Sequence, residues 1–141
     1  MKIHDLVTTH FVYSTILGGT LLILSALLIS GRVQAAPQVT AHYSKSAGKE
    51  IVVEITVPSP PPSSIIFVQK LPTEVMIQRT QPKANSINQK KGKVKWLLRN
   101  LKPGKLNIRM FLDREVDRNE ISGEIRFKAS HGKGMTTQQV K

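Results

Sequence analysis

The chain has 141 residues, carries 21 Lys and Arg against 9 Asp and Glu, and contains no cysteine. This length corresponds to roughly one domain, which disfavours a large two-domain enzyme. The lack of cysteine excludes a disulfide scaffold, a cysteine-ligated zinc or iron–sulfur site and a cysteine nucleophile.

The first 35 residues predict a targeting segment. Residues 6–31 contain no Lys, Arg, Asp or Glu, and residues 16–29 are almost wholly apolar. A core of this kind, followed by small residues three and one before a cut, is typical of a secretory signal peptide. Val33-Gln34-Ala35 fits that rule, so we expect cleavage between Ala35 and Ala36. An uncleaved anchor is the alternative, because about 20 apolar residues, here 11–30, can also span a bilayer.

In both cases we expect the rest of the chain to lie outside the cytoplasm, in the periplasm or at the cell surface. An uncleaved segment would anchor it in the inner membrane. Residues 1–35 contain Lys2, Arg32 and Asp5, so the remaining 106 residues carry 19 basic and 8 acidic side chains. About 106 residues suffice for one modest hydrophobic core.

The residues after Pro37 predict short β-strands, because apolar and polar residues alternate with period two and β-branched residues recur. We expect seven strands, over residues 39–43, 51–57, 65–69, 75–78, 94–100, 106–112 and 121–130. Seven short strands within residues 36–130 predict an all-β sandwich domain of two sheets. A small closed barrel is the structural alternative.

The connections between these strands are polar or rich in turn residues. The prolines of residues 58–62 end the second strand, since proline lacks the amide donor of a sheet. Residues 80–93 predict a lysine-rich loop, and Lys102-Pro103-Gly104-Lys105 predicts a tight turn. Residues 113–120 form a charged connection. We expect residues 131–141 to be a polar, frayed C-terminal tail.

The alternation also predicts which side chains face the core. We expect the single tryptophan, Trp96, to fill the core and not to form an exposed platform for carbohydrate. The expected core includes Trp96, Leu98, Ile108, Met110, Ile125 and Phe127. Phe111 falls on the outward side of its strand, where an aromatic residue marks a contact surface or is an ordinary exposed side chain.

The order of these features resembles the conserved-repeat, immunoglobulin-like domain of bacterial and archaeal envelope proteins. The matching segments are Ile51–Val57, the strand leading to Leu71-Pro72, Val94–Leu98, and Leu101-Lys102-Pro103-Gly104 with the strand after it. The resemblance spans residues 48–130. It implies an immunoglobulin-like sandwich and a location in the cell envelope. The family is not known for catalysis. The chain departs from the family where prolines replace an Asn-x-Gly-type loop after the early strand.

No motif for catalysis or phosphate binding is present. His42 and His131 have no partner at a spacing typical of metal ligands. The series Asp113-x-Glu115-x-Asp117 faintly resembles a calcium loop, but Arg118 stands where such a loop needs glycine, and no helices flank it. We therefore predict no catalytic residue, no metal, no cofactor and no small-molecule substrate.

The excess of basic residues is the strongest functional indication. Strand alternation places several cations on the outward side, where they would attract polyanions such as anionic lipid headgroups, envelope polymers or acidic protein surfaces. The candidate contact residues are Lys93, Lys95, Arg99, Arg109, Phe111, Arg126 and Lys128. We expect Arg109 to lie on a strand paired with that of Arg126 and Lys128, while Lys95 and Arg99 share this sheet or lie on the other. Export disfavours nucleic acid as the partner.

Two hypotheses follow. The first is a non-catalytic envelope module that binds another envelope protein or packs in an assembly. The alternative is an exported basic domain that binds polyanions through its Lys and Arg side chains.

The targeting segment predicts that the mature chain begins at Ala36. N-terminal sequencing or the intact mass of the exported protein would check this. A full-length mass in the membrane fraction would contradict cleavage and favour the anchor.

Overall fold

The computed structural model describes residues 38–128 and 134–141. The predicted targeting segment, its cleavage point and Ala129 lie outside these residues. Among the described residues we find no helix with the length and hydrophobicity that a membrane span requires.

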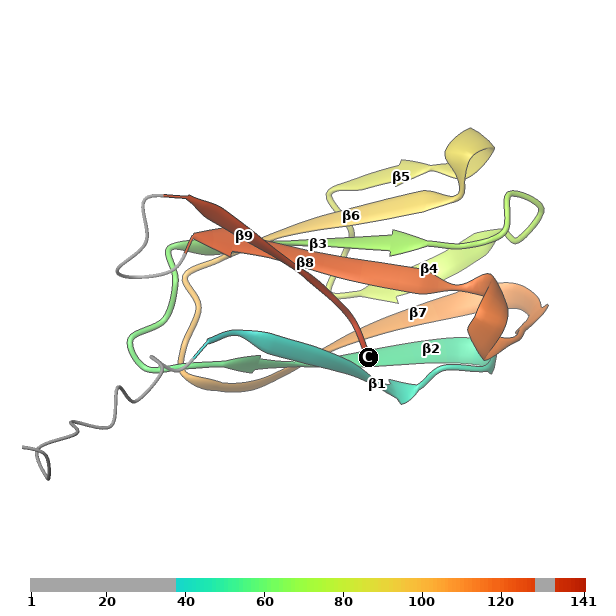
Figure 1. Ribbon diagram of the computed structural model, residues 1–141. Helices are drawn as coiled ribbons and strands as arrows, with labels where there is room; N and C mark the ends of the chain where they lie inside the picture. Colours follow the sequence, from blue (N-terminus) through green and yellow to red (C-terminus); the bar gives the residue numbers. More distant parts are fainter. Residues whose placement is uncertain (1–37, 129–133) are drawn as a thin grey trace, which may run out of the picture. The chain divides into compact units, whose positions relative to one another are not determined.

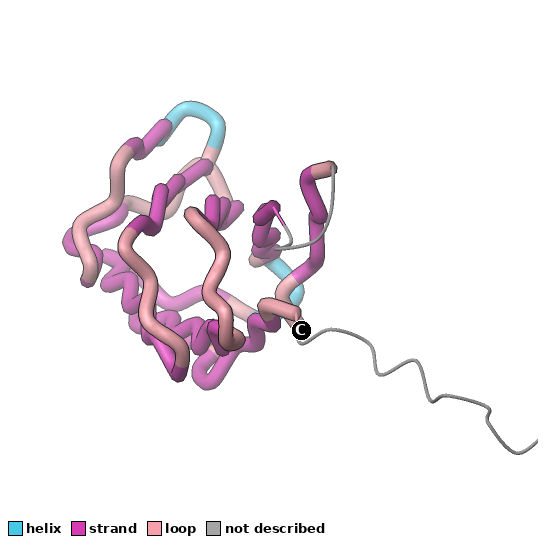
Figure 2. The backbone as a smooth tube through the Cα atoms, turned by 90° about the vertical axis from the view of Figure 1, so that its left-hand side faces the viewer, coloured by secondary structure: helices cyan, strands magenta, loops and turns pink. Residues whose placement is uncertain are grey.

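Two antiparallel sheets are packed face to face as a β-sandwich, and Figures 1 and 2 show these layers from directions 90° apart. The four-stranded sheet has the order β1 (Thr40–Lys45), β2 (Gly48–Val57), β7 (Gly104–Val116), β4 (Ile77–Gln81). The five-stranded sheet has the order β5 (Ser86–Asn88), β6 (Lys93–Arg99), β3 (Ser64–Lys70), β8 (Ser122–Lys128), β9 (Met135–Gln139). Each of these strands pairs only within its own sheet, so the sandwich and not the closed barrel describes this part of the chain.

The inward side chains of both sheets form one core. Along β2, the alternate residues Ile51, Val53, Ile55 and Val57 are all buried, as the period of two predicts. Trp96 is fully buried and stacks on Phe67, with ring centroids 5.1 Å apart. Its indole nitrogen donates to the carbonyl oxygen of Pro82 at 3.0 Å, so its polar atom is satisfied as well.

The expected core is confirmed for five of its six members. Trp96, Ile108, Met110, Ile125 and Phe127 are buried, whereas Leu98 is only partly buried against the edge of the core. Leu98 lies one residue before the end of β6 and lines a pocket with Val57 and Leu106, which leaves its side chain partly exposed.

The predicted loop over residues 80–93 is wrong in part. It contains the end of β4, the short strand β5 and a one-turn 3-10 helix, η1 (Gln89–Lys91). β5 pairs with β6 through Ser86, Ile87 and Asn88. All three residues are exposed, so no alternation of buried and polar positions marks this strand in the sequence.

The expected frayed tail also differs from the structure. β9 pairs with β8 over residues 135–139, and Val140 is buried. The backbone then reaches the other sheet, because the amide of Tyr43 donates to the carbonyl oxygen of Lys141 at 2.8 Å. Figure 1 shows this crossing from β9 to β1. The last residues therefore join the two sheets along one side.

Other strands also differ in extent from the prediction, and β2 begins three residues earlier, at Gly48. β4 begins two residues later than predicted, and Val75 packs in the core just before it. β7 continues through Val116, so the charged connection is reduced to a second one-turn 3-10 helix, η2 (Arg118–Glu120), with its flanking residues.

We predict that Trp96→Ala lowers the free energy of unfolding by about 3–5 kcal/mol, the range for truncating a large buried aromatic residue. Denaturant unfolding of the purified protein measures this loss. Trp96→Phe, which keeps most of the ring volume, should cost clearly less. A loss below about 1 kcal/mol for the alanine variant would contradict the core assignment.

Candidate functional site

The outer face of the five-stranded sheet gathers most of the predicted cations. On β3 the outward positions are Ser64, Ile66, Val68 and Lys70, and the registers of β6 and β8 place their outward residues beside them. We call six side chains of this surface the basic face: Lys70, Lys93, Lys95, Arg99, Arg126 and Lys128. All six are exposed.

The arrangement on this surface follows from strand pairing. On β6, Lys93 lies opposite Lys70, Lys95 opposite Val68 and Arg99 opposite Ser64. On the other side of β3, Arg126 of β8 lies opposite Ile66. Neighbouring strands are about 4.8 Å apart, so the cations of β6 and β8 form two rows on either side of β3.

The basic face has little compensating negative charge. Glu124 is the only carboxylate at an outward position of the five-stranded sheet, and it is paired with Arg126. Among the described residues, no other member of the basic face makes an ion pair. Lys70 and Lys93 are direct cross-strand neighbours, an arrangement that destabilises a sheet.

The centre of this surface is a shallow hollow of about 400 Å³. Its floor is formed by the half-buried side chains of Ile66 and Val68 on β3. Lys93 and Lys95 line one side, Arg126 lines the other, and Lys70 lies at one end. Glu124, which is paired with Arg126, also lines the hollow. The hollow therefore offers an apolar floor among four cations and one carboxylate that is already paired.

The outer face of the four-stranded sheet is different, because three of its cations, Lys45, Lys105 and Arg109, have carboxylate partners. Glu54 accepts from Lys105 at 2.9 Å and lies 3.7 Å from His42, and the hydrogen bond from Lys105 lowers the pKa of Glu54. Glu50 accepts from Lys45 at 3.0 Å and lies 3.9 Å from Arg109.

The expected neighbourhood of Arg109 is therefore wrong. Arg109 is on β7, which pairs with β2 and β4, whereas Arg126 and Lys128 are on β8, which pairs with β3 and β9. Alternation correctly places Arg109 outward, but it does not determine which sheet a strand joins. Lys93, Lys95 and Arg99 share the sheet of Arg126 and Lys128.

Phe111 also belongs to the outer face of the four-stranded sheet. Its side chain is half-buried, and the guanidinium group of Arg79 lies over the ring at 4.3 Å from the centroid. A cation–π contact of this kind is favourable and covers part of the ring. A contact role for Phe111 stays a prediction.

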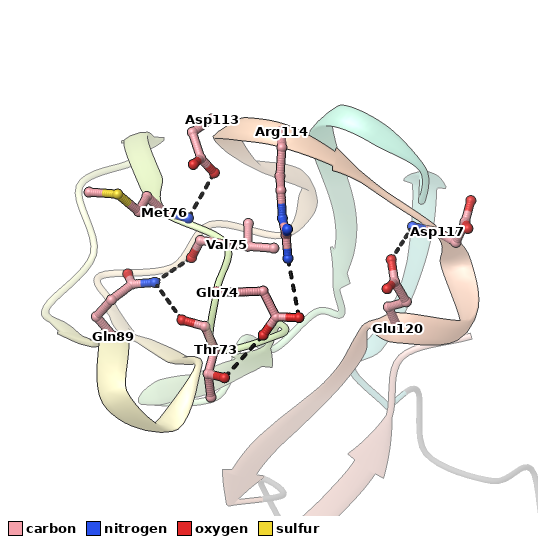
Figure 3. A network of polar contacts seen from close by, with 9 residues as sticks. All are labelled: Thr73, Glu74, Val75, Met76, Gln89, Asp113, Arg114, Asp117 and Glu120. Atoms are coloured by element: carbon pink, nitrogen blue, oxygen red, sulfur yellow. Dashed lines mark hydrogen bonds and ion pairs between the residues drawn. The ribbon is translucent and has the colours of Figure 1, made fainter.

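Many carboxylates gather at one end of the sandwich, where they hold loops together (Figure 3). Asp113 accepts from the amide of Met76 at 2.8 Å, and Glu74 lies 3.2 Å from Arg114. Hydrogen bonds from its own backbone amide and from Thr73 lower the pKa of Glu74.

Asp117, from the series that resembles a calcium loop, closes the turn of η2 together with Glu120. The Asp117 amide donates to the carboxylate of Glu120 at 2.8 Å. Among residues 38–128 and 134–141, no three His, Asp or Glu side chains are placed to hold one metal ion.

Sequence reasoning missed Lys70. The third predicted strand ended at residue 69, one position too early. The series Ile66, Val68, Lys70 continues the outward alternation, so extending that strand by one residue would have found it.

The chain has no significant match to a protein-family model, a curated protein or a solved structure.

We predict that Lys93→Glu raises the free energy of unfolding by about 0.5 kcal/mol at low salt, because it replaces a like-charge cross-strand pair by an attractive one. Denaturant unfolding at low and high salt measures the gain, which should shrink as salt screens it.

Lys95→Glu is the matched control for that change. Lys95 lies opposite Val68 and Ser86 and has no charged cross-strand neighbour. An equal gain in both variants would show that only net charge matters and would contradict a specific repulsion between Lys70 and Lys93.

Proposed function

We propose that this protein is an exported, non-catalytic immunoglobulin-like module that binds an anionic component of the cell envelope through its basic face. The observation that carries the proposal is the separation of charge between the two outer faces of the sandwich. On one face Glu50 and Glu54 form ion pairs with three lysine or arginine side chains. The other face leaves Lys70, Lys93 and Lys95 without carboxylate partners among the described residues.

The immunoglobulin-like assignment is supported by strand order. In constant-type domains one sheet has the order A-B-E-D and the other contains C-F-G. The order β1-β2-β7-β4 corresponds to the first, and β3-β8-β9 corresponds to the second. β5 and β6 would then be an insertion between strands D and E that extends the second sheet beyond β3.

Export is supported by the sequence of residues 1–35, with its uncharged apolar core and small residues before Ala36. An anionic partner outside the cytoplasm fits a surface of this charge, since fields of one sign raise the local concentration and the association rate of oppositely charged ligands.

A second candidate function is interaction with another envelope protein through the edges of the five-stranded sheet. Ile87 on the edge strand β5 is 49% exposed, and Met135 on the opposite edge strand β9 is 61% exposed. An edge strand offers unpaired backbone groups to a partner strand. The affinity of such an interface would depend little on salt concentration, whereas the affinity of binding through the basic face would fall steeply as the salt concentration rises.

We expect the triple variant Lys93→Gln, Lys95→Gln, Arg126→Gln to elute from a polyanion column, such as heparin, at clearly lower salt than the parent protein. Its unfolding midpoint should be nearly unchanged, because exposed charges contribute little to folding.

The matched control is Lys45→Gln, Lys105→Gln, Arg109→Gln, which removes the same charge from the outer face of the four-stranded sheet. This variant should elute close to the parent protein. Equal shifts in both variants would mean that net charge alone causes retention, and no shift in either would leave the protein-binding candidate.

A further inference from the structure

A pocket of about 500 Å³ lies where β2 ends and the β6–β7 turn begins. The central hollow of the basic face lies elsewhere, because it is lined by residues of β3, β5, β6 and β8 and shares none of them with this pocket. Its apolar lining comes from both sheets and the turn, through Val57, Trp96, Leu98, Leu101 and Leu106. The last three side chains are only partly buried against the core, so they are available to a ligand.

Hydrogen bonds hold one wall of this pocket, residues 82–85, in place. The indole nitrogen of Trp96 donates to the carbonyl oxygen of Pro82 at 3.0 Å. The Asn85 side chain accepts from the amide of Leu97 at 2.7 Å, and the Asn85 amide donates to the carbonyl oxygen of Lys95 at 2.9 Å. The pocket is therefore preformed, as ligand sites usually are.

All charged residues that line the pocket are cationic: Lys83, Arg99, Lys102 and Lys105. Lys105 forms an ion pair with Glu54 at 2.9 Å. The other three make no ion pair among the described residues. A charged ligand here must therefore be an anion.

We infer that this end pocket binds an amphiphilic anion, an alkyl or acyl chain that ends in a phosphate or carboxylate group. The chain would cover the partly buried leucines, and the anionic head would be held by Lys83 and Lys102. The volume lies within the range of small-molecule sites, about 300–1,000 Å³. A free amphiphile and one chain of a membrane lipid share this chemistry.

The position of Trp96 provides a direct measurement, because it is the single tryptophan of the chain and lines the pocket. The full exported protein is titrated with decyl phosphate below its micelle concentration, and binding is followed by tryptophan fluorescence and by calorimetry. We expect saturable binding at one site. Decanol, which lacks the charge, and inorganic phosphate, which lacks the chain, should bind at least tenfold more weakly.

The variant Lys83→Gln, Lys102→Gln should weaken decyl phosphate binding roughly tenfold, since charge-assisted contacts are the stronger ones. Lys93→Gln, Lys95→Gln removes the same charge from the basic face and should leave the affinity within about twofold of the parent, since these lysines do not line the pocket. The first variant should also keep its retention on the polyanion column. Decyl phosphate binding therefore tests the end pocket and column retention tests the basic face, so that either proposal can fail without the other.

Three results would overturn this inference. One is no saturable binding by either method. Another is equal binding of decanol and decyl phosphate. The third is equal weakening in both lysine variants.

Anionic vesicles added in place of decyl phosphate separate the two sources of the ligand. Vesicle binding that depends on Lys83 and Lys102 assigns the pocket to a membrane lipid. Vesicle binding that depends only on Lys93 and Lys95, with no binding of monomeric decyl phosphate, would contradict a ligand site in the pocket.

Discussion

The alternation of side chains along β3, β6 and β8 is the constraint on which the rest of this structure depends. On β6, Val94 and Trp96 face the core while Lys93 and Lys95 face solvent, so the residues that hold the sheet in place also fix where the cations point. A slip of one residue in register would bury the lysines and expose the tryptophan. The stacked pair Phe67 and Trp96 therefore stabilises the core and, through the backbone, orders the surface on its other side.

The two outer faces show that this surface charge is not a general property of the fold. The four-stranded sheet places Glu50 and Glu54 among its cations, and both make ion pairs there. The five-stranded sheet places Lys70 directly opposite Lys93, which works against stability. Proteins commonly retain such local costs at functional sites. The end pocket shares one cation with the basic face, because Arg99 belongs to that face and also lines the pocket.

The inward and outward positions could be predicted from the sequence because the period of two is a local property of each strand. The pairing of strands could not, since it depends on contacts between distant segments, and Arg109 was accordingly placed beside the wrong strand. β5 and β9 were missed for another reason. β5 has no buried residue, and β9 lacks a fully buried one, so their pairing with β6 and β8 leaves no hydrophobic pattern. The end pocket was beyond prediction, because its walls come from segments brought together only by the fold.

The most direct test of the basic face is to map a bound polyanion on the folded protein. Backbone amide resonances would be assigned by NMR and followed during titration with a short heparin oligosaccharide at moderate salt. The structure predicts shifts concentrated in β3, β6 and β8, around the hollow over Ile66 and Val68, with little change in β2 and β7. Shifts centred on the four-stranded sheet, or spread evenly over all exposed cations, would contradict the assignment of the binding surface.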